Sequence, residues 1–381
     1  MLDESSKRIA EGLFRRYYEK ANFQIGNVNE REFGFGDFEK KIAYRHYSFK
    51  DNASLKRYLA EKAPAFASYS SSLYRYPDRR PMERKEWLGS GLIFDLDAND
   101  LHLECQSKHG SSWVCQNCLD GVKAETIKLI EDFLVPDFGF SKGEISVNFS
   151  GNRGYHVRVD SKELFSMTSQ ERKGISDYIA GVNLDITRFF PTISQRGKRL
   201  TGPTPSDYGW GGKLAKAMVS ALNSGVDSLA SLGIDRVIAR KLVRSKADVI
   251  FGITTGNWDK VNIPRKGEFW GNVMKRIAIA QGDSIDKNVT NDIYHLIRIP
   301  ETIHGDTGLA GKAVQLTMLD GFDPMKDAIA FRQGVMRVRT GSVPAFQMHG
   351  EEYGPYKDSD VELPVYAALY LILKRLAKPL E

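Results

Sequence analysis

The sequence predicts an α/β (α+β) fold, with a mixed β-sheet core, helices, an inserted helical subdomain and a small zinc-binding motif. Three patterns lead to this prediction. Residues 89–97 form an apolar run bounded by glycines, which is typical of a buried strand. Residues 144–159 alternate in polarity on both sides of a glycine turn, as in a β-hairpin. Residues 161–282 are patterned as helices, and strand and loop patterning returns after them.

The helical segment divides the chain. We expect residues 1–160 and 281–381 to form one discontinuous core domain, with the zinc-binding motif at residues 101–119 inside it. Residues 161–280 are expected to form the helical subdomain. A chain of 381 residues is long enough for this arrangement, because domains usually contain about 50–250 residues.

Composition excludes several classes of protein. With 41% hydrophobic and 27% charged residues, the chain is typical of a globular protein and not of a disordered one. It has no apolar run of about 18 residues and no signal-peptide pattern, so we expect no membrane association and a cytoplasmic location. The net charge of +6 is compatible with a polyanionic partner but does not require one.

Two carboxylates interrupt the apolar run at 89–97. Residues i and i+2 share one face of a strand, so Asp95 and Asp97 project together, opposite Phe94 and Leu96. Because neighbouring buried carboxylates repel each other, we expect a cation on them, and hard oxygen ligands favour Mg²⁺ or Mn²⁺. Two such ions about 3.5–4 Å apart catalyse phosphoryl transfer in polymerases and nucleases. The alternative is a solvated turn or cap, which the apolar flanks disfavour.

All three cysteines lie between positions 105 and 118. Cys115 and Cys118 have the Cys-x-x-Cys spacing, and Cys105 and His109 precede them. Three sulfurs and one imidazole are the ligands of a closed structural zinc site. His102 is a rival fourth ligand. The alternatives are three ordinary reduced cysteines or a redox pair of Cys115 and Cys118.

The hairpin at 144–159 has one apolar and one polar face. The polar face carries Ser146, Asn148, Ser150, His156 and Arg158. Such a face either binds phosphate oxygens, through its side chains and the backbone amides of the turn, or is exposed to solvent. The segment alone does not decide between these two interpretations.

Three further polar residues follow the helical segment. Asp286, in a region patterned as strand and loop, could complete a carboxylate triad with Asp95 and Asp97. Arg298 and His304 flank a proline and a glycine, and their donors suit a triphosphate. Taken singly, without the other motifs, each of the three is better explained as a surface residue on a loop.

Four motifs in this order resemble the catalytic small subunit of archaeal and eukaryotic DNA primase. They are Phe94-Asp95-Leu96-Asp97, the Cys/His cluster, Ser150-Gly151-Asn152-Arg153-Gly154-Tyr155-His156, and Leu296-Ile297-Arg298-Ile299-Pro300-Glu301-Thr302-Ile303-His304-Gly305. The order and spacing hold from Arg31-Glu32-Phe33 to Glu362-Leu363-Pro364. The total length and the compact cysteine cluster are most like the archaeal form.

The resemblance implies a DNA primase, a template-directed nucleotidyltransferase that makes short RNA primers de novo on single-stranded DNA for replication. It implies that Asp95, Asp97 and Asp286 hold two catalytic Mg²⁺ or Mn²⁺ ions. The residues implied to bind the phosphates of the nucleoside triphosphate are Ser150, Arg153, His156, Arg298 and His304. A structural Zn²⁺ in the Cys/His cluster and a heterodimer with the primase large subunit are also implied, as is a sheet-based core with an inserted helical subdomain.

Two other functions remain open at this point. One is a primase-polymerase that acts in DNA repair or on a mobile element, and the other is a non-catalytic nucleic-acid-binding module. The three aspartates disfavour the module, because binding alone needs no buried carboxylate triad. Two positions also depart from the eukaryotic pattern, which has a second arginine at Asn152 and a lysine at Arg298.

Overall fold

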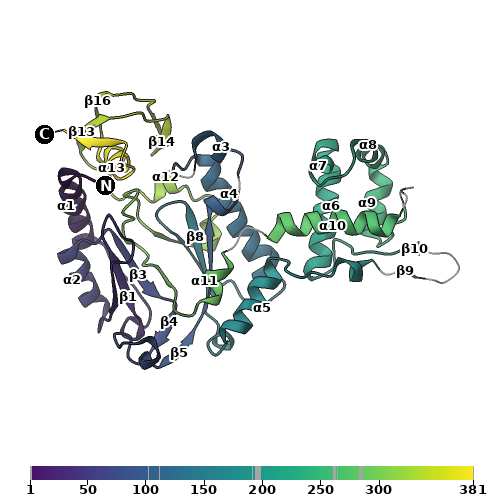
Figure 1. Ribbon diagram of the computed structural model, residues 1–381, viewed down its shortest axis with the longest axis horizontal. Coiled ribbons are helices and arrows are strands. Elements are labelled where there is room, and N and C mark those ends of the chain that lie inside the picture. The colour runs from purple at the N-terminus through teal and green to yellow at the C-terminus, as the bar shows by residue number, and fades with distance from the viewer. Residues whose placement is uncertain are drawn as a thin grey trace. The chain divides into compact units, whose positions relative to one another are not determined.

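The structure is a computed structural model that describes residues 2–101, 103–110, 112–190, 192–193, 199–260, 263, 265–282 and 286–380 (Figure 1). It confirms the α+β composition predicted from the sequence, and every strand pair among the described residues is antiparallel. The chain forms two compact units. Unit 1 comprises Met1–Ile127, Ser141–Arg172 and Asp286–Glu381, and unit 2 comprises Lys128–Phe140 and Lys173–Ile285. Among the described residues, no helix has both the length and the apolarity needed to cross a membrane.

The first sheet of unit 1 has the strand order β11-β3-β1-β2. Its strands are β1 (Phe33–Gly36), β2 (Tyr44–Tyr47), β3 (Phe66–Ser70) and β11 (Leu296–Arg298). Helices α1 (Glu4–Lys20) and α2 (Asn52–Lys62) pack side by side on it (Figure 1). Asp3 caps α1 by accepting a hydrogen bond from the amide of Ser6, which satisfies one of the free donors at the helix start.

The second sheet of unit 1 has the order β12-β7-β8-β6 and carries the predicted carboxylates. Its strands are β6 (Leu92–Asp97), β7 (Ile145–Phe149), β8 (Gly154–Val159) and β12 (Lys312–Val314). The predicted strand at 89–97 divides at Gly91, because β5 (Trp87–Ser90) pairs separately with β4 (Ser72–Tyr74). The hairpin predicted at 144–159 is confirmed as β7 and β8.

The polar face of that hairpin lies between the two sheets. His156 and Arg158 are each only 9% exposed, and Nη1 of Arg158 donates to the hydroxyl of Tyr69 on β3 at 3.3 Å. Nε of Arg158 also donates to Asp160 at 2.8 Å. The solvent-exposed interpretation of this face is therefore wrong for His156 and Arg158, while Ser146 is exposed.

The C-terminal part of unit 1 adds a third layer. Strands β13 (Val335–Thr340), β16 (Asp360–Pro364) and β17 (Ala377–Pro379) form a sheet against which α13 (Val365–Leu373) packs, and every residue of α13 is buried. The remaining elements assigned to residues of unit 1 are β14 (Phe346–Met348), β15 (Glu351–Tyr353), α3 (Gln106–His109), α4 (Gln116–Lys128, whose last residue belongs to unit 2), α11 (Lys287–Asn291), α12 (Pro324–Asp327), η1 (Val28–Glu30), η2 (Met82–Lys85), η3 (Ala98–Leu101), η5 (Lys162–Leu164) and η7 (Leu316–Met318).

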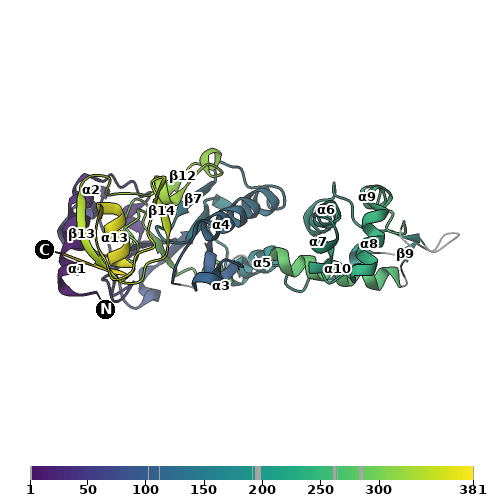
Figure 2. The ribbon, with the colours of Figure 1, turned by 90° about the horizontal axis from the view of Figure 1, so that it is seen from above.

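Unit 2 is mainly helical (Figure 2). Its elements are the π-helix η4 (Leu129–Leu134), η6 (Ile186–Phe189), β9 (Thr192–Ile193), β10 (Arg199–Leu200), α6 (Gly209–Ser224), α7 (Val226–Ser231), α8 (Arg236–Arg244), α9 (Lys246–Thr254) and α10 (Lys266–Gly282), and most of α5 (Ser169–Ile179) also belongs to it. Aromatic residues form its core, since the ring of Trp258 lies edge-on to Trp270 at 4.9 Å and to Phe190 at 5.1 Å.

Candidate functional site

Asp95 and Asp97 lie at the end of β6, where this strand pairs with β8. Asp95 is opposite His156, and Asp97 is opposite Gly154. The side chains of Asp95 and Asp97 are 32% and 31% exposed, whereas Phe94 and Leu96 on the other face are fully buried. The alternation of the strand therefore presents both carboxylates on one accessible face.

Asp286 reaches the same place from a different element. It directly precedes α11, so the strand pattern expected after the helical segment is wrong for residues 287–291. The amide of Asp286 donates to the backbone oxygen of Asp95 at 3.1 Å, and α11 packs on β6 (Figure 1). Burial, followed by the negative charges of Asp97 and Asp286, raises the pKa of Asp95 to about 6. A divalent cation would relieve this repulsion, and carboxylate oxygens are the ligands that Mg²⁺ and Mn²⁺ prefer.

Arg153 lies against one of these carboxylates. Its Nε donates to Oδ1 and Oδ2 of Asp97 at 2.6 and 2.8 Å. The backbone oxygen of Arg153 also accepts from the amide of Ala98 at 3.1 Å, which holds the turn against the end of β6. The guanidinium is thus positioned beside the carboxylates, where it offsets the charge of Asp97.

Arg298 is a cation of the site whose guanidinium is largely buried. It lies on β11, and its guanidinium is 5.2 Å from the centre of the Phe66 ring. Its Nε and Nη1 are buried and have no hydrogen-bond acceptor within the described residues. Burial lowers its pKa to about 10, so the group remains charged at neutral pH. An unpaired buried charge is costly, and an anionic ligand would supply the missing acceptors.

The hairpin turn is fixed against the loop that follows β11. Gly151 has a φ of +84°, and a Cβ built on it would lie 2.9 Å from Cβ of His304. The hydroxyl of Thr307 donates to the oxygen of Gly151 at 2.5 Å. The Ser150 hydroxyl accepts from the amide of Gly154 at 3.3 Å. Only glycine allows this approach, which brings Ser150 and His304 to one end of the two sheets.

The two histidines of the site are neutral at pH 7. Burial, followed by the charge of Arg298, lowers the pKa of His156 to about 4 and that of His304 well below its usual value. Nε2 of His156 lies 3.5 Å from Asp95, and Nδ1 of His304 accepts from the amide of Asp306 at 3.2 Å. As neutral rings they offer hydrogen bonds to a phosphate, whereas Arg298 offers charge.

Sequence reasoning missed several charged residues around this site. Lys41 and Lys374 both lower the pKa of His304, and burial lowers the pKa of Lys374 to about 8. Asp100 interacts with the three aspartates, since burial and then their charges raise its pKa. Lys41 belongs to a basic and aromatic segment visible in the sequence, but no local pattern indicates that Lys374, at the end of α13, contributes to the site.

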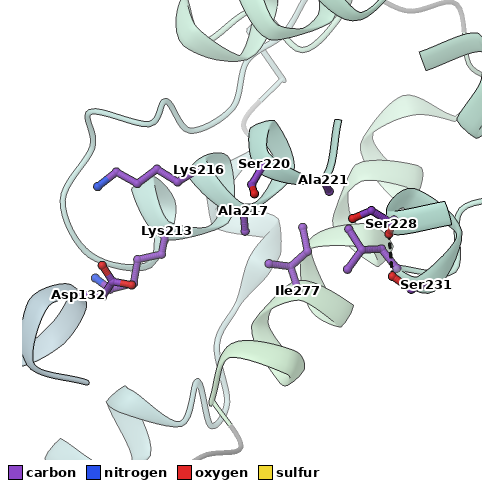
Figure 3. A pocket seen from close by; sticks show the side chains of 10 residues that line it. Asp132, Lys213, Lys216, Ala217, Ser220, Ala221, Ser228, Ser231 and Ile277 are labelled. Atoms are coloured by element: carbon purple, nitrogen blue, oxygen red, sulfur yellow. Dashed lines mark hydrogen bonds between the residues drawn. The ribbon is translucent and has the colours of Figure 1, made fainter. Parts of the chain in front are cut away.

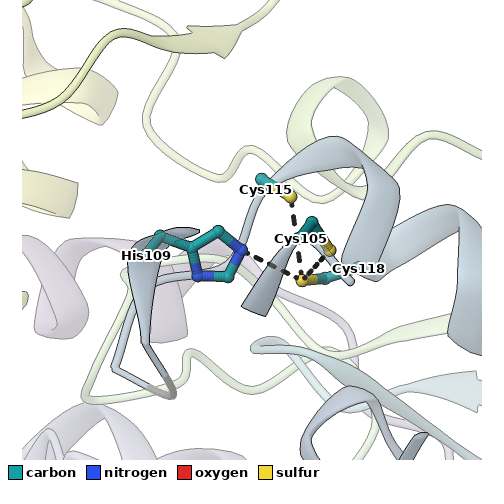
Figure 4. A group of neighbouring side chains, drawn as sticks. All are labelled: Cys105, His109, Cys115 and Cys118. Carbon is teal, nitrogen blue, oxygen red and sulfur yellow. Dashed lines mark hydrogen bonds between the residues drawn. The ribbon is translucent and has the colours of Figure 1, made fainter. Parts of the chain in front are cut away.

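The predicted zinc ligands form a compact cluster (Figure 4). Sγ of Cys118 lies 3.4 Å from Sγ of Cys105, 3.7 Å from Sγ of Cys115 and 3.5 Å from Nε2 of His109. These separations match the edges of a tetrahedron around zinc, which are about 3.8 Å for Zn–S bonds of about 2.3 Å. Nδ1 of His109 lies 2.7 Å from the oxygen of Gly110, so this contact directs Nε2 toward the sulfurs. The rival ligand His102 lies outside the described residues.

The cluster is attached to the strand that carries the carboxylates. Gln106, which directly follows Cys105, donates through its side chain to the oxygen of Ala98 at 2.5 Å. Its side-chain oxygen also accepts from the amide of Leu103 at 3.0 Å. Ala98 directly follows Asp97. An ordered loop around the cysteines therefore helps to hold the end of β6 in position. The four ligands leave no open position for a substrate, so a metal here would act on structure.

Unit 2 contains a separate hollow of about 420 Å³ between α6, α7 and α10 (Figure 3). Lys213 and Lys216 line it together with serines such as Ser220. Nζ of Lys213 lies 2.5 Å from Oδ2 of Asp137, and the two side chains are 9% and 4% exposed. The charge of Lys213 is therefore compensated within the unit and is not available for an anionic ligand.

Comparisons with known proteins agree with this arrangement. Residues 94–316 match the family described as DNA primase small subunit. The chain is 33% identical to the DNA primase small subunit of Methanothrix thermoacetophila, over 99% of this chain and 100% of the relative. It is 31% identical to the same subunit of Methanococcoides burtonii, over 99% of both chains. The corresponding protein of Nitrosopumilus maritimus is 27% identical, over 99% of both chains.

The raised pKa of Asp95 predicts that this residue destabilises the metal-free fold. An aspartate with a folded pKa of about 6 and an unfolded pKa of about 3.9 binds more protons when folded, so stability falls as pH rises through this window. In a chelating buffer at pH 8, Asp95→Asn should therefore raise the free energy of unfolding by about 1–2 kcal/mol, after allowing for solvent screening. This difference in the free energy of unfolding between Asp95→Asn and the wild type should become smaller as the pH is lowered from 7 to 4.5. Urea unfolding experiments measure it.

Asp120→Asn is the matched control, because it removes an exposed carboxylate of α4. It should change stability by less than about 0.5 kcal/mol. A lower stability of Asp95→Asn than of the wild type at pH 8 would contradict the electrostatic interpretation.

The cluster of three cysteines and one histidine predicts bound zinc. The protein purified under reducing conditions should contain about one zinc per chain, and Cys115→Ser should lose it. The variant should also show faster proteolysis of the loop between Ala98 and Cys118, because the metal no longer orders it. Metal analysis by mass spectrometry and limited proteolysis test this. Wild-type protein without zinc would rule out the closed site.

Proposed function

The chain belongs to the DNA primase small-subunit family, and we propose that it starts short RNA primers de novo on single-stranded DNA for replication. In this proposal it is a nucleotidyltransferase that uses nucleoside triphosphates as substrates. A large subunit is its partner in a heterodimer, and the cytoplasm is its location.

The observation that carries the proposal is a buried guanidinium without an acceptor, in the same site as repelling carboxylates. Two guanidinium nitrogens of Arg298 have no acceptor among the described residues, and the charges of Asp97 and Asp286 add to burial in raising the pKa of Asp95. A nucleoside triphosphate with divalent ions brings both charges together, whereas an uncharged substrate would satisfy neither group.

The carboxylates fit two Mg²⁺ or Mn²⁺ ions, held in this proposal by Asp95, Asp97 and Asp286. When bound, the ions supply the Lewis-acid chemistry that activates the attacking 3′-hydroxyl and stabilises the leaving pyrophosphate. Arg298 binds and orients the triphosphate, and its charge offsets the charge that develops during transfer.

The other polar groups act as positioning donors. Neutral His156 and His304 donate hydrogen bonds to phosphate oxygens, and Ser150 keeps the turn in place beside them. Arg153 donates a hydrogen bond to Asp97. In this proposal its guanidinium also binds a phosphate of the incoming nucleotide. The zinc cluster has the separate role of ordering the loop after β6.

Primer synthesis on an unprimed single-stranded template tests the proposal. The protein with ribonucleotides and Mn²⁺ or Mg²⁺ should make short RNA, and Asp95→Ala should make none while remaining folded. Asp120→Ala removes an exposed carboxylate and should retain activity. Extension of a supplied primer without initiation would favour a primase-polymerase of repair or of a mobile element. DNA binding without any nucleotide addition would favour a non-catalytic module.

Loss of the Arg298 charge should weaken nucleotide use. Arg298→Ala removes charge-assisted hydrogen bonds worth roughly 1.5–3 kcal/mol, so the apparent nucleotide affinity should fall about tenfold or more. The maximal rate should fall as well, because the same charge stabilises the transition state. Nucleotide titrations of primer extension measure both quantities.

Arg298→Lys is the matched control for this experiment. It retains the charge and should keep more activity than Arg298→Ala, although a lysine loses the bidentate geometry. If Arg298→Ala weakens binding of single-stranded DNA and leaves the nucleotide dependence unchanged, Arg298 contacts the template and not the triphosphate.

A further inference from the structure

The net charge of the chain belongs to unit 2. Its residues include 18 lysines and arginines but only 12 aspartates and glutamates, an excess of 6, which equals the net charge of +6 of the whole chain. The residues of unit 1 carry 36 of each sign. The unit that holds the carboxylates and Arg298 is therefore neutral overall, and the helical unit is basic.

Helix α8 concentrates this charge on one exposed face. Asp235 caps its start by accepting hydrogen bonds from the amides of Val237 and Ile238, and the helix buries Ala239 and Leu242. The exposed basic residues are Arg236, Arg240, Lys241 and Arg244. The three arginines have the spacing i, i+4 and i+8, so they lie in one row with a rise of about 6 Å between neighbours.

The side chains of Arg240, Lys241 and Arg244 make no hydrogen bond or ion pair within the described residues, whereas Arg236 pairs with Asp227 at 2.9 Å. Like charges at i and i+4 destabilise a helix, so Arg240 and Arg244 act against the fold of α8. A polyanion along the row would remove this repulsion.

The next helix adds an exposed aromatic ring. Phe251 of α9 is 61% exposed, and Nζ of Lys260 lies 5.8 Å from the centre of its ring. Basic groups together with exposed aromatic rings suit single strands, whose unpaired bases stack on such rings, better than duplexes.

We propose that the basic face of α8, formed by Arg240, Lys241 and Arg244, is a binding surface for single-stranded DNA. The inference rests on the proposed function only for the choice of DNA as the polymer. It adds a nucleic-acid contact in the helical unit that is separate from the carboxylates and from Arg298.

The test is a triple charge reversal, Arg240→Glu, Lys241→Glu and Arg244→Glu, in the full chain. Fluorescence anisotropy with a labelled oligothymidine, without nucleotides or divalent metal, reports binding independently of catalysis. The variant should bind at least about tenfold more weakly at low salt, and the slope of log affinity against log salt should decrease by about 2. The rate of nucleotide addition at saturating template should stay at the wild-type value.

The matched control reverses three exposed basic residues of α1, namely Arg8→Glu, Arg16→Glu and Lys20→Glu. It makes the same change in net charge and should bind within about threefold of the wild type. Equal losses in both variants would overturn the proposal, since general charge would then explain the binding. Wild-type affinity and slope in the α8 variant, no binding by the wild-type protein, or a preference for duplex DNA would also overturn it. If the wild type binds as expected but makes no primers, the proposed function fails and the α8 surface stands.

Discussion

The repulsion between carboxylates at the end of β6 is the interaction on which the rest of the site depends. Asp95 and Asp97 share a strand face, and Asp286 adds a third charge. Burial, followed by the charges of these two neighbours, raises the pKa of Asp95 to about 6. The fold reduces the repulsion between these carboxylates only in part. Arg153 offsets Asp97, and the Asp286 amide binds the Asp95 backbone, which fixes α11 beside the strand. In the proposed function, bound divalent cations would relieve the remaining repulsion.

The positive charge of Arg298 lies in the same unit but does not neutralise the carboxylates. Arg298 lies on the other sheet, with two guanidinium nitrogens that have no acceptor among the described residues. Burial, followed by the charge of Arg298, lowers the pKa of His156 and of His304, so both rings are neutral. If Arg298 paired with an aspartate, both would be satisfied and neither would bind a ligand. The two sheets therefore keep a guanidinium that lacks acceptors apart from carboxylates that repel one another. In the proposed function, a metal–triphosphate complex would supply the acceptors and reduce the repulsion.

Local patterns in the sequence were enough to predict the strand at Asp95, the hairpin and the cysteine cluster, because alternation, turn glycines and ligand spacing act within a few residues. Properties that depend on packing between distant segments were missed. The hairpin face is buried because β3 brings Tyr69 onto Arg158, and Asp286 arrives at the start of a helix and not on a strand. The neutral state of the histidines depends on burial beside Arg298, which no local pattern records.

The two units differ in their balance of charge. In unit 1, basic and acidic residues are equal in number, so the carboxylates and Arg298 lie in a unit that is neutral overall. An excess of lysines there would pair with the aspartates and compete with a metal. Unit 2 has no comparable site to protect among its described residues, and its one deeply buried ion pair, Lys213 with Asp137, is already satisfied. A surplus of basic side chains, as on α8, therefore lies in the unit that does not carry Asp95 and Arg298.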